Sequence, residues 1–186
     1  MSALGSVDSS LLRELISYDP ETGNCTWRVR SVHLFEDDTL KTAGERCAIW
    51  NGLFAGIEVG SLNCQGYRRT VIGGKLFYLH RIIFSIVMGR WPTVFVDHRN
   101  GDRLDNRWSN LREASRSQNL QNSPLRANSR SGFKGVFWDG QYGKWHARIN
   151  ISGRPKYLGR FDRAADAHAA YVRAAVRYFG EFARTA

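Results

Sequence analysis

The residues from Val96 to Asn122 constrain the fold of this chain more than any other stretch. A β-prone run leads into Asp97 and His98, a polar and turn-rich segment follows, and strand-prone residues return at 111–114. Ser115 can then cap a short helix. The pattern predicts two short strands followed by a helix, with carboxylate, imidazole and amide groups concentrated in one small unit.

These groups suit a particular chemistry. A histidine has an ordinary pKa of ~6.5, so the His98 ring can accept a proton from water near neutral pH. Oxygen ligands from an aspartate and an asparagine favour a hard ion such as Mg²⁺ or Mn²⁺. Neighbouring residues of a strand point to opposite sides, so Asp97 and His98 share one site only where the strand bends or ends. The simpler interpretation is a turn aspartate, a surface ring and asparagines that cap loops.

Positive charge is concentrated in the last two thirds of the chain. The net charge is +10, yet residues 1–66 carry 5 basic and 9 acidic residues. Residues 67–122 carry 10 and 4, and residues 123–186 carry 12 and 4. This distribution is typical of a nucleic-acid-binding surface, although a generally basic surface is the plain alternative.

The last third has the pattern of a small sheet followed by a helix. Strand-prone runs at 134–138, 144–151 and 156–161 are separated by glycine-containing turns. A helix with an alanine-rich face follows Asp162 and ends at Gly180, and we expect its buried residues to be Ala165, Ala169, Val172, Val176 and Phe179. Alternation places Lys144, His146 and Arg148 on one sheet face and Trp145, Ala147 and Ile149 under the helix.

The first 90 residues predict further elements. Leu11, Leu12, Leu15 and Ile16 have helical spacing, a short strand follows at 25–29, and residues 31–56 are interpreted as mainly loop. A Gly73-Gly74 hairpin precedes an apolar helix that ends at Gly89. We therefore divide the chain into an accessory region (1–66), a domain at 67–122, a linker (123–132) and a domain at 133–186.

Cysteine usage and hydropathy exclude several classes of protein. Cys25, Cys47 and Cys64 have no paired spacing, so we expect three reduced, buried side chains rather than a zinc ribbon or a disulfide framework. Met1–Ser10 lacks the features of a signal peptide. No stretch reaches the ~20 apolar residues of a membrane span, so we expect a cytoplasmic protein with no membrane partner.

Residues 79–122 resemble the HNH endonuclease family of phages and homing introns. The residues that carry the resemblance are Asp97-His98, Asn110 and Asn119. The resemblance implies a ββα-metal (His-Me finger) fold with His98 as general base and Asn110 as the residue that orients it. It further implies that Asp97 and Asn119 hold one divalent ion. Many family members have histidine where this chain has Asn119. One carboxylate and one amide should bind Mg²⁺ weakly until a DNA phosphate completes the ligand set.

The last third resembles the APETALA-two/ethylene-response-factor DNA-binding domain, on Lys134-Gly135-Val136, Gly143 to Ile149 and Leu158 to Phe161. Phe137 and Tyr157 depart from the family's pattern, so the plant target sequence does not carry over. We expect Trp145 to pack in the core rather than read the groove. The DNA-binding candidates of the whole chain are His80, Arg81, Lys134, Trp138, Lys144, Arg148, Arg154, Lys156 and Arg160.

The expected fold class is α+β, with a ββα-metal nuclease domain and a three-stranded antiparallel sheet packed on one helix. The expected function is metal-dependent hydrolysis of double-stranded DNA by a homing-type enzyme encoded by a phage or mobile element in a bacterial cell, without a small-molecule cofactor. One active site cuts one strand, so cutting both needs a homodimer or two events. The alternatives are a non-catalytic DNA-binding regulator with an idle HNH fold and, more remotely, an RNA-binding protein.

Overall fold

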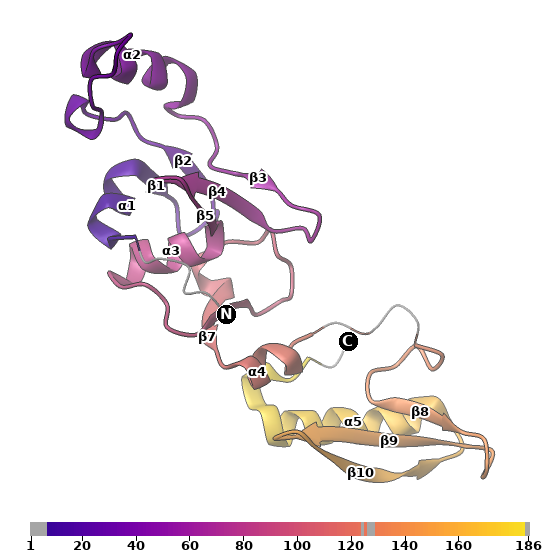
Figure 1. Cartoon of the computed structure of the whole chain (residues 1–186). Helices are drawn as coiled ribbons and strands as arrows, with labels where there is room; N and C mark the ends of the chain where they lie inside the picture. The colour runs from indigo at the N-terminus through magenta and orange to yellow at the C-terminus, as the bar shows by residue number, and fades with distance from the viewer. Residues whose placement is uncertain (1–6, 124, 126–128, 185–186) are drawn as a thin grey trace. The chain divides into compact units, whose positions relative to one another are not determined.

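The computed structural model describes residues 7–123, 125 and 129–184, and the chain divides into two compact units, 1–113 and 114–186 (Figure 1). Part of the expected linker, residues 124 and 126–128, lies outside the described residues. Both units mix helices and strands, so the chain is a mixed α/β protein. The ββα-metal arrangement itself stays a prediction.

The first unit is built on one apolar core that joins the N-terminal residues to the predicted nuclease segment. Leu12 of α1 (Ser9–Leu15) and Ile16 of β1 (Ile16–Tyr18) are buried in the same cluster as Phe77 and Ile82. β1 pairs antiparallel with β2 (Cys25–Trp27). Residues before position 67 thus share the core of the strands and helix that follow them.

The predicted hairpin and helix of this unit are confirmed. β4 (Arg68–Ile72) pairs with β5 (Lys75–Tyr78) through Gly73 and Gly74, whose φ angles are +56° and +74°. The short β3 (Ser61–Leu62) pairs with the other edge of β4. α3 (Leu79–Met88) buries its apolar stripe and ends at Gly89 in the left-handed region.

The interpretation of residues 31–56 as loop is wrong. A short 3₁₀ turn spans Val32–Leu34, and α2 spans Ala43–Phe54. A capping box starts α2, since Thr42 accepts from the backbone N–H of Glu45 while the Glu45 carboxylate accepts from that of Thr42. Only Cys47 of this helix is buried, so α2 has no apolar stripe that periodicity could detect.

The candidate site lies on a pair of short strands at the end of the first unit. β6 (Phe95–His98) and β7 (Leu111–Ala114) form a two-stranded sheet, and a 3₁₀ turn at Trp108–Asn110 leads into β7. α4 (Arg116–Gln121) follows and belongs to the second unit. Ser115 caps α4 as predicted, in a capping box with Gln118.

The second unit is a three-stranded antiparallel sheet in the order β10–β9–β8, with α5 packed on one face (Figure 1). The strands are β8 (Val136–Asp139), β9 (Lys144–Ile151) and β10 (Arg154–Phe161), and α5 spans Ala164–Phe179. A 3₁₀ turn at Gly180–Phe182 follows α5. The expected alternation along β9 is confirmed, because Ala147 and Ile149 are buried on the helix side and Trp145 packs against that core.

The predicted buried face of α5 is wrong for three of its five residues, while Phe179 packs against the core and Val172 is half-buried. The residues that α5 buries are Ala167, Tyr171, Ala174 and Ala175, whereas Ala165, Ala169 and Val176 are exposed. Alanines occur all round this helix, so hydropathy alone does not fix its rotation. Tyr171 fixes it, because its ring packs against the backbone of Gly135 at the start of the sheet. The cysteines also differ from expectation, since Cys64 is exposed, whereas Cys25 and Cys47 are buried and all three are free thiols.

Candidate active site and nucleic-acid interface

His98 is the last residue of β6 and its side chain is almost completely buried, at 3% exposure. Its Nε2 lies 3.2 Å from Oδ1 of Asn106. The His80 ring packs edge-on against it, with ring centroids 5.1 Å apart. The end of the strand and the loop after it therefore hold the imidazole in one orientation.

Burial also sets the protonation state of the two histidines. Desolvation lowers the pKa of His98, and the hydrogen bond to Asn106 and nearby aspartates only partly oppose this effect. Burial lowers the pKa of His80 to about 3. Both rings are therefore neutral near neutral pH. The Asn106 carbonyl oxygen accepts only, so this contact places the His98 proton on Nε2 and leaves Nδ1 as the basic nitrogen.

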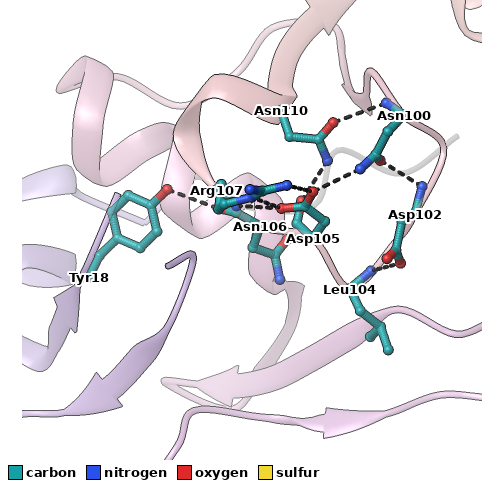
Figure 2. A network of polar contacts seen from close by, with 8 residues as sticks. All are labelled: Tyr18, Asn100, Asp102, Leu104, Asp105, Asn106, Arg107 and Asn110. Atoms are coloured by element: carbon teal, nitrogen blue, oxygen red, sulfur yellow. Dashed lines mark hydrogen bonds and ion pairs between the residues drawn. The ribbon is translucent and has the colours of Figure 1, made fainter. Parts of the chain in front are cut away.

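The loop from residue 99 to residue 110 is pinned by amide hydrogen bonds from Asn110 (Figure 2). Its Oδ1 accepts from the backbone N–H of Asn100 at 3.0 Å, and its Nδ2 donates to the carbonyl of Asp105 at 2.7 Å. Its own carbonyl accepts from the backbone N–H of Arg99 at 2.8 Å. In this structure Asn110 thus acts on the loop that carries Asn106, the partner of His98.

A second layer of contacts fixes Asp105 and Asn106 in the same loop (Figure 2). Arg107 donates to both carboxylate oxygens of Asp105, at 2.8 and 2.7 Å, and Asn100 donates to one of them. The guanidinium holds the pKa of Asp105 down to about 2. From the N-terminal region, the Tyr18 hydroxyl donates to the carbonyl of Asn106 at 2.9 Å.

Asp97, the expected metal ligand, lies beside His98 and forms a buried ion pair with Arg112. Arg112 Nη2 and Nε are 3.0 and 3.2 Å from Oδ2 of Asp97, and the two side chains are only 5% and 8% exposed. A carboxylate belongs to the donor class that suits a hard ion, so Asp97 fits a divalent metal in chemistry, while Arg112 competes for its charge.

Asn119, the second expected ligand, lies on α4 in the second unit, and its side chain is half-buried. Its backbone N–H donates to the Ser115 carbonyl in the first turn. Among the described residues, no group of three or more histidine, cysteine, aspartate or glutamate side chains could hold a metal.

The structure gives His80 and Arg81, two of the expected DNA contacts, intramolecular partners. His80 is buried and stacked on Tyr78, with ring centroids 5.6 Å apart. Arg81 donates to the carbonyls of Pro92 and Val94 at 3.0 and 2.9 Å. Arg81 thus holds α3 against the segment that leads into β6, while His80 packs on the candidate site.

Several basic candidates of the second unit also have partners within the protein. Lys134 donates to the carbonyls of Gln121 and Ser123 at the end of α4, at 2.6 and 2.7 Å. Burial lowers its pKa to about 8. Lys156 donates to the Tyr178 hydroxyl at 2.7 Å. Lys134 thus ties the end of α4 to the start of the sheet.

The other candidates lie on or beside the sheet. Lys144 and Arg160 form ion pairs of 3.0 Å with Asp162 and Asp139. Trp138 packs edge-on against Trp145 with ring centroids 5.0 Å apart. Arg148 and Arg154 are exposed. Neither of these two arginines has an acidic partner among the residues that the structure describes.

Sequence reasoning gave no role to Arg112, Tyr18 or Asp105. The Arg112 pairing depends on which residues of β6 and β7 lie side by side, and no local pattern shows this. Tyr18 is 88 positions away from Asn106 in the sequence.

Comparison with known proteins identifies part of this region. The family model of the HNH endonucleases matches residues 77–121, from β5 through α4. This match makes the segment an HNH endonuclease domain, which indicates a nuclease or DNA-binding function. Searches of curated proteins and of solved structures found no match. No helix among residues 7–123, 125 and 129–184 is long and apolar enough to cross a bilayer.

Proposed function

We propose that this chain is a metal-dependent HNH DNA endonuclease of the homing type, encoded by a phage or mobile element, that docks on double-stranded DNA through its basic C-terminal sheet. The observation that carries the proposal is the buried, neutral His98 at the end of β6, oriented by Asn106 inside the segment that the HNH family matches. A neutral imidazole in a fixed orientation is what a general base requires.

The residues have separate roles in the proposed reaction. His98 takes a proton from the attacking water at Nδ1, and Asn106 keeps the ring in the tautomer that allows this. Asn110 fixes the loop that carries Asn106. Asp97 and Asn119 would hold a Mg²⁺ or Mn²⁺ ion, which supplies stabilisation of the charge on the phosphate and on the leaving 3′ oxygen. The products would carry 5′-phosphate and 3′-hydroxyl ends.

One observation favours the second candidate function, a DNA-binding regulator with an idle nuclease fold. The Asp97 carboxylate already has a positive partner, Arg112, at 3.0 Å. If this ion pair excludes the divalent ion, the chain would still bind DNA through its sheet and would not cut it.

A plasmid assay separates the two functions. Full-length protein is incubated with supercoiled plasmid and Mg²⁺, alone and with a chelator. His98→Ala is expected to slow cutting by about 10²- to 10⁴-fold and to leave DNA binding intact. The matched control is His33→Ala, since His33 is a histidine with a 65% exposed side chain and should not affect cutting. Binding without metal-dependent cutting in the unmodified protein would favour the regulator.

A further inference from the structure

One face of the C-terminal sheet is covered by α5, and the opposite face carries a row of aromatic rings. Phe137 of β8 lies opposite His146 of β9, and their rings are stacked with centroids 5.6 Å apart. Tyr157 of β10 lies 6.4 Å from His146 on its other side. One ring from each of the three strands therefore crosses the face that α5 does not cover.

Two members of this aromatic row are exposed to solvent. Phe137 is 40% and Tyr157 58% exposed. Arg148 lies beside them, opposite Tyr157 in the strand register, with its guanidinium 4.3 Å from the Phe137 ring. Only one of the seven charged residues between 131 and 160 is acidic. An apolar strip bordered by positive charge is complementary to a surface that combines apolar groups with phosphates.

The ring packing indicates which groups the row can contact. Phe137 and His146 are stacked on each other at an interplanar angle of 25°, and Arg148 also covers Phe137. Ring faces occupied in this way offer little area for stacking on an unpaired base. The exposed apolar area suits small apolar groups instead, and the thymine methyl is the one such group in the major groove of duplex DNA.

We propose that the Phe137–His146–Tyr157 row contacts thymine methyl groups in the major groove and gives this protein a preference for thymine at the contacted positions. The proposal rests on the proposed DNA docking through this sheet and does not depend on catalysis. The arginines beside the row hold the phosphates, and the row distinguishes bases by the presence of the 5-methyl group.

Replacing thymine with uracil in the DNA tests this proposal, because the exchange removes only the methyl group. The full-length protein, in chelator to prevent cutting, selects its preferred duplexes from a random pool. The selected duplex is then resynthesised with uracil in place of each thymine in turn. We expect the dissociation constant to rise about fourfold for each contacted methyl, as expected for one buried carbon.

Variants then assign the effect to the row. Phe137→Ala and Tyr157→Ala are expected to bring the thymine-to-uracil affinity ratio close to one at the positions that they contact. Tyr142→Ala is the matched control, because Tyr142 is 54% exposed but lies in the β8–β9 turn, outside the row, and its loss should leave the ratio unchanged.

DNA-binding measurements on the unmodified protein are sufficient to overturn the proposal. Equal affinity for thymine and uracil at every position would overturn it and leave the proposed function standing. Stronger binding of single-stranded than of duplex DNA would also overturn it, because it would show base stacking. Absence of any DNA binding would overturn both this proposal and the proposed docking of the sheet on DNA. The plasmid assay would still test cutting independently.

Discussion

At the scale of single residues, burial keeps the His98 ring unprotonated down to a lower pH. A charged imidazole loses hydration inside the protein, so the folded state lowers the pKa of His98 below its ordinary 6.5. The ring is active when unprotonated. Cutting should therefore persist at a pH where an exposed histidine would already be protonated.

The pH dependence of the single-turnover cutting rate tests this consequence. With saturating DNA, we expect the rate to rise with pH and reach half its maximum below 6.5, the ordinary histidine value. The rate should change little from there to neutral pH. A half-maximum clearly above 6.5 would mean that another group limits the reaction or that bound DNA raises the pKa of His98.

The Asp97–Arg112 pair and the Arg90–Glu113 pair form a matched comparison of a buried and an exposed ion pair. Arg112→Met leaves a buried carboxylate without this partner and should lower the free energy of unfolding by about 3–5 kcal/mol. Arg90 bonds Glu113 at 2.7 Å with side chains 45% and 27% exposed. Arg90→Met should cost much less, because water screens the charges of an exposed pair. Denaturant unfolding measures the loss of stability in both variants. Equal losses would contradict the expectation that burial makes the Asp97–Arg112 pair matter more.

At the scale of elements, the contact between Gly135 and α5 determines how the helix lies on the sheet. Gly135 has φ +74°, and a Cβ there would lie 2.1 Å from the Tyr171 ring. Gly143 has φ +62° with open space around it. Gly135→Ala adds a steric clash to backbone strain, whereas Gly143→Ala adds strain of about 1 kcal/mol only. We expect the melting temperature of the second unit to fall much further for Gly135→Ala than for Gly143→Ala. Similar decreases for the two variants would show that the Tyr171 ring moves aside without cost.

The elements that the sequence predicts correctly have local signals. Gly89 and Gly180 end α3 and α5, the Gly73-Gly74 turn joins β4 and β5, and Ser115 caps α4. α2 was missed because a capping box starts it while almost none of its residues face a core. The buried face of α5 was missed because the packing of Tyr171 on Gly135, a tertiary contact, sets the rotation of an alanine-rich helix.

The candidate site shows the same division between local and tertiary information. The resemblance of Asp97, His98 and Asn110 to the HNH pattern indicates the chemistry, and it can be seen in the sequence because these residues lie close together along the chain. The ion pair of Asp97 with Arg112 and the hydrogen bond of Tyr18 to the site loop depend on tertiary contacts. Lys134 was assigned to DNA because it matches a position of the APETALA-two/ethylene-response-factor domain, and the structure directs its ammonium to two backbone carbonyls.

At the scale of the whole molecule, the net positive charge belongs almost entirely to one unit. Residues 114–186 carry 13 basic and 4 acidic residues, whereas residues 1–113 carry 14 and 13. The unit with the sheet should therefore supply most of the attraction to DNA phosphates, and the first unit should add little to non-specific affinity.

The salt dependence of DNA binding by the full-length chain measures how many cations contact phosphates. Each phosphate contact adds about 0.9 to the slope of log affinity against log salt concentration. Arg148→Gln and Arg154→Gln should each lower the slope by about that amount, because these exposed side chains have no acidic partner among the described residues. Lys134→Gln is the matched control, since the Lys134 ammonium bonds carbonyls of its own chain and should not change the slope. A slope that falls for Lys134→Gln and not for the two arginine variants would show that DNA contacts a different part of this unit.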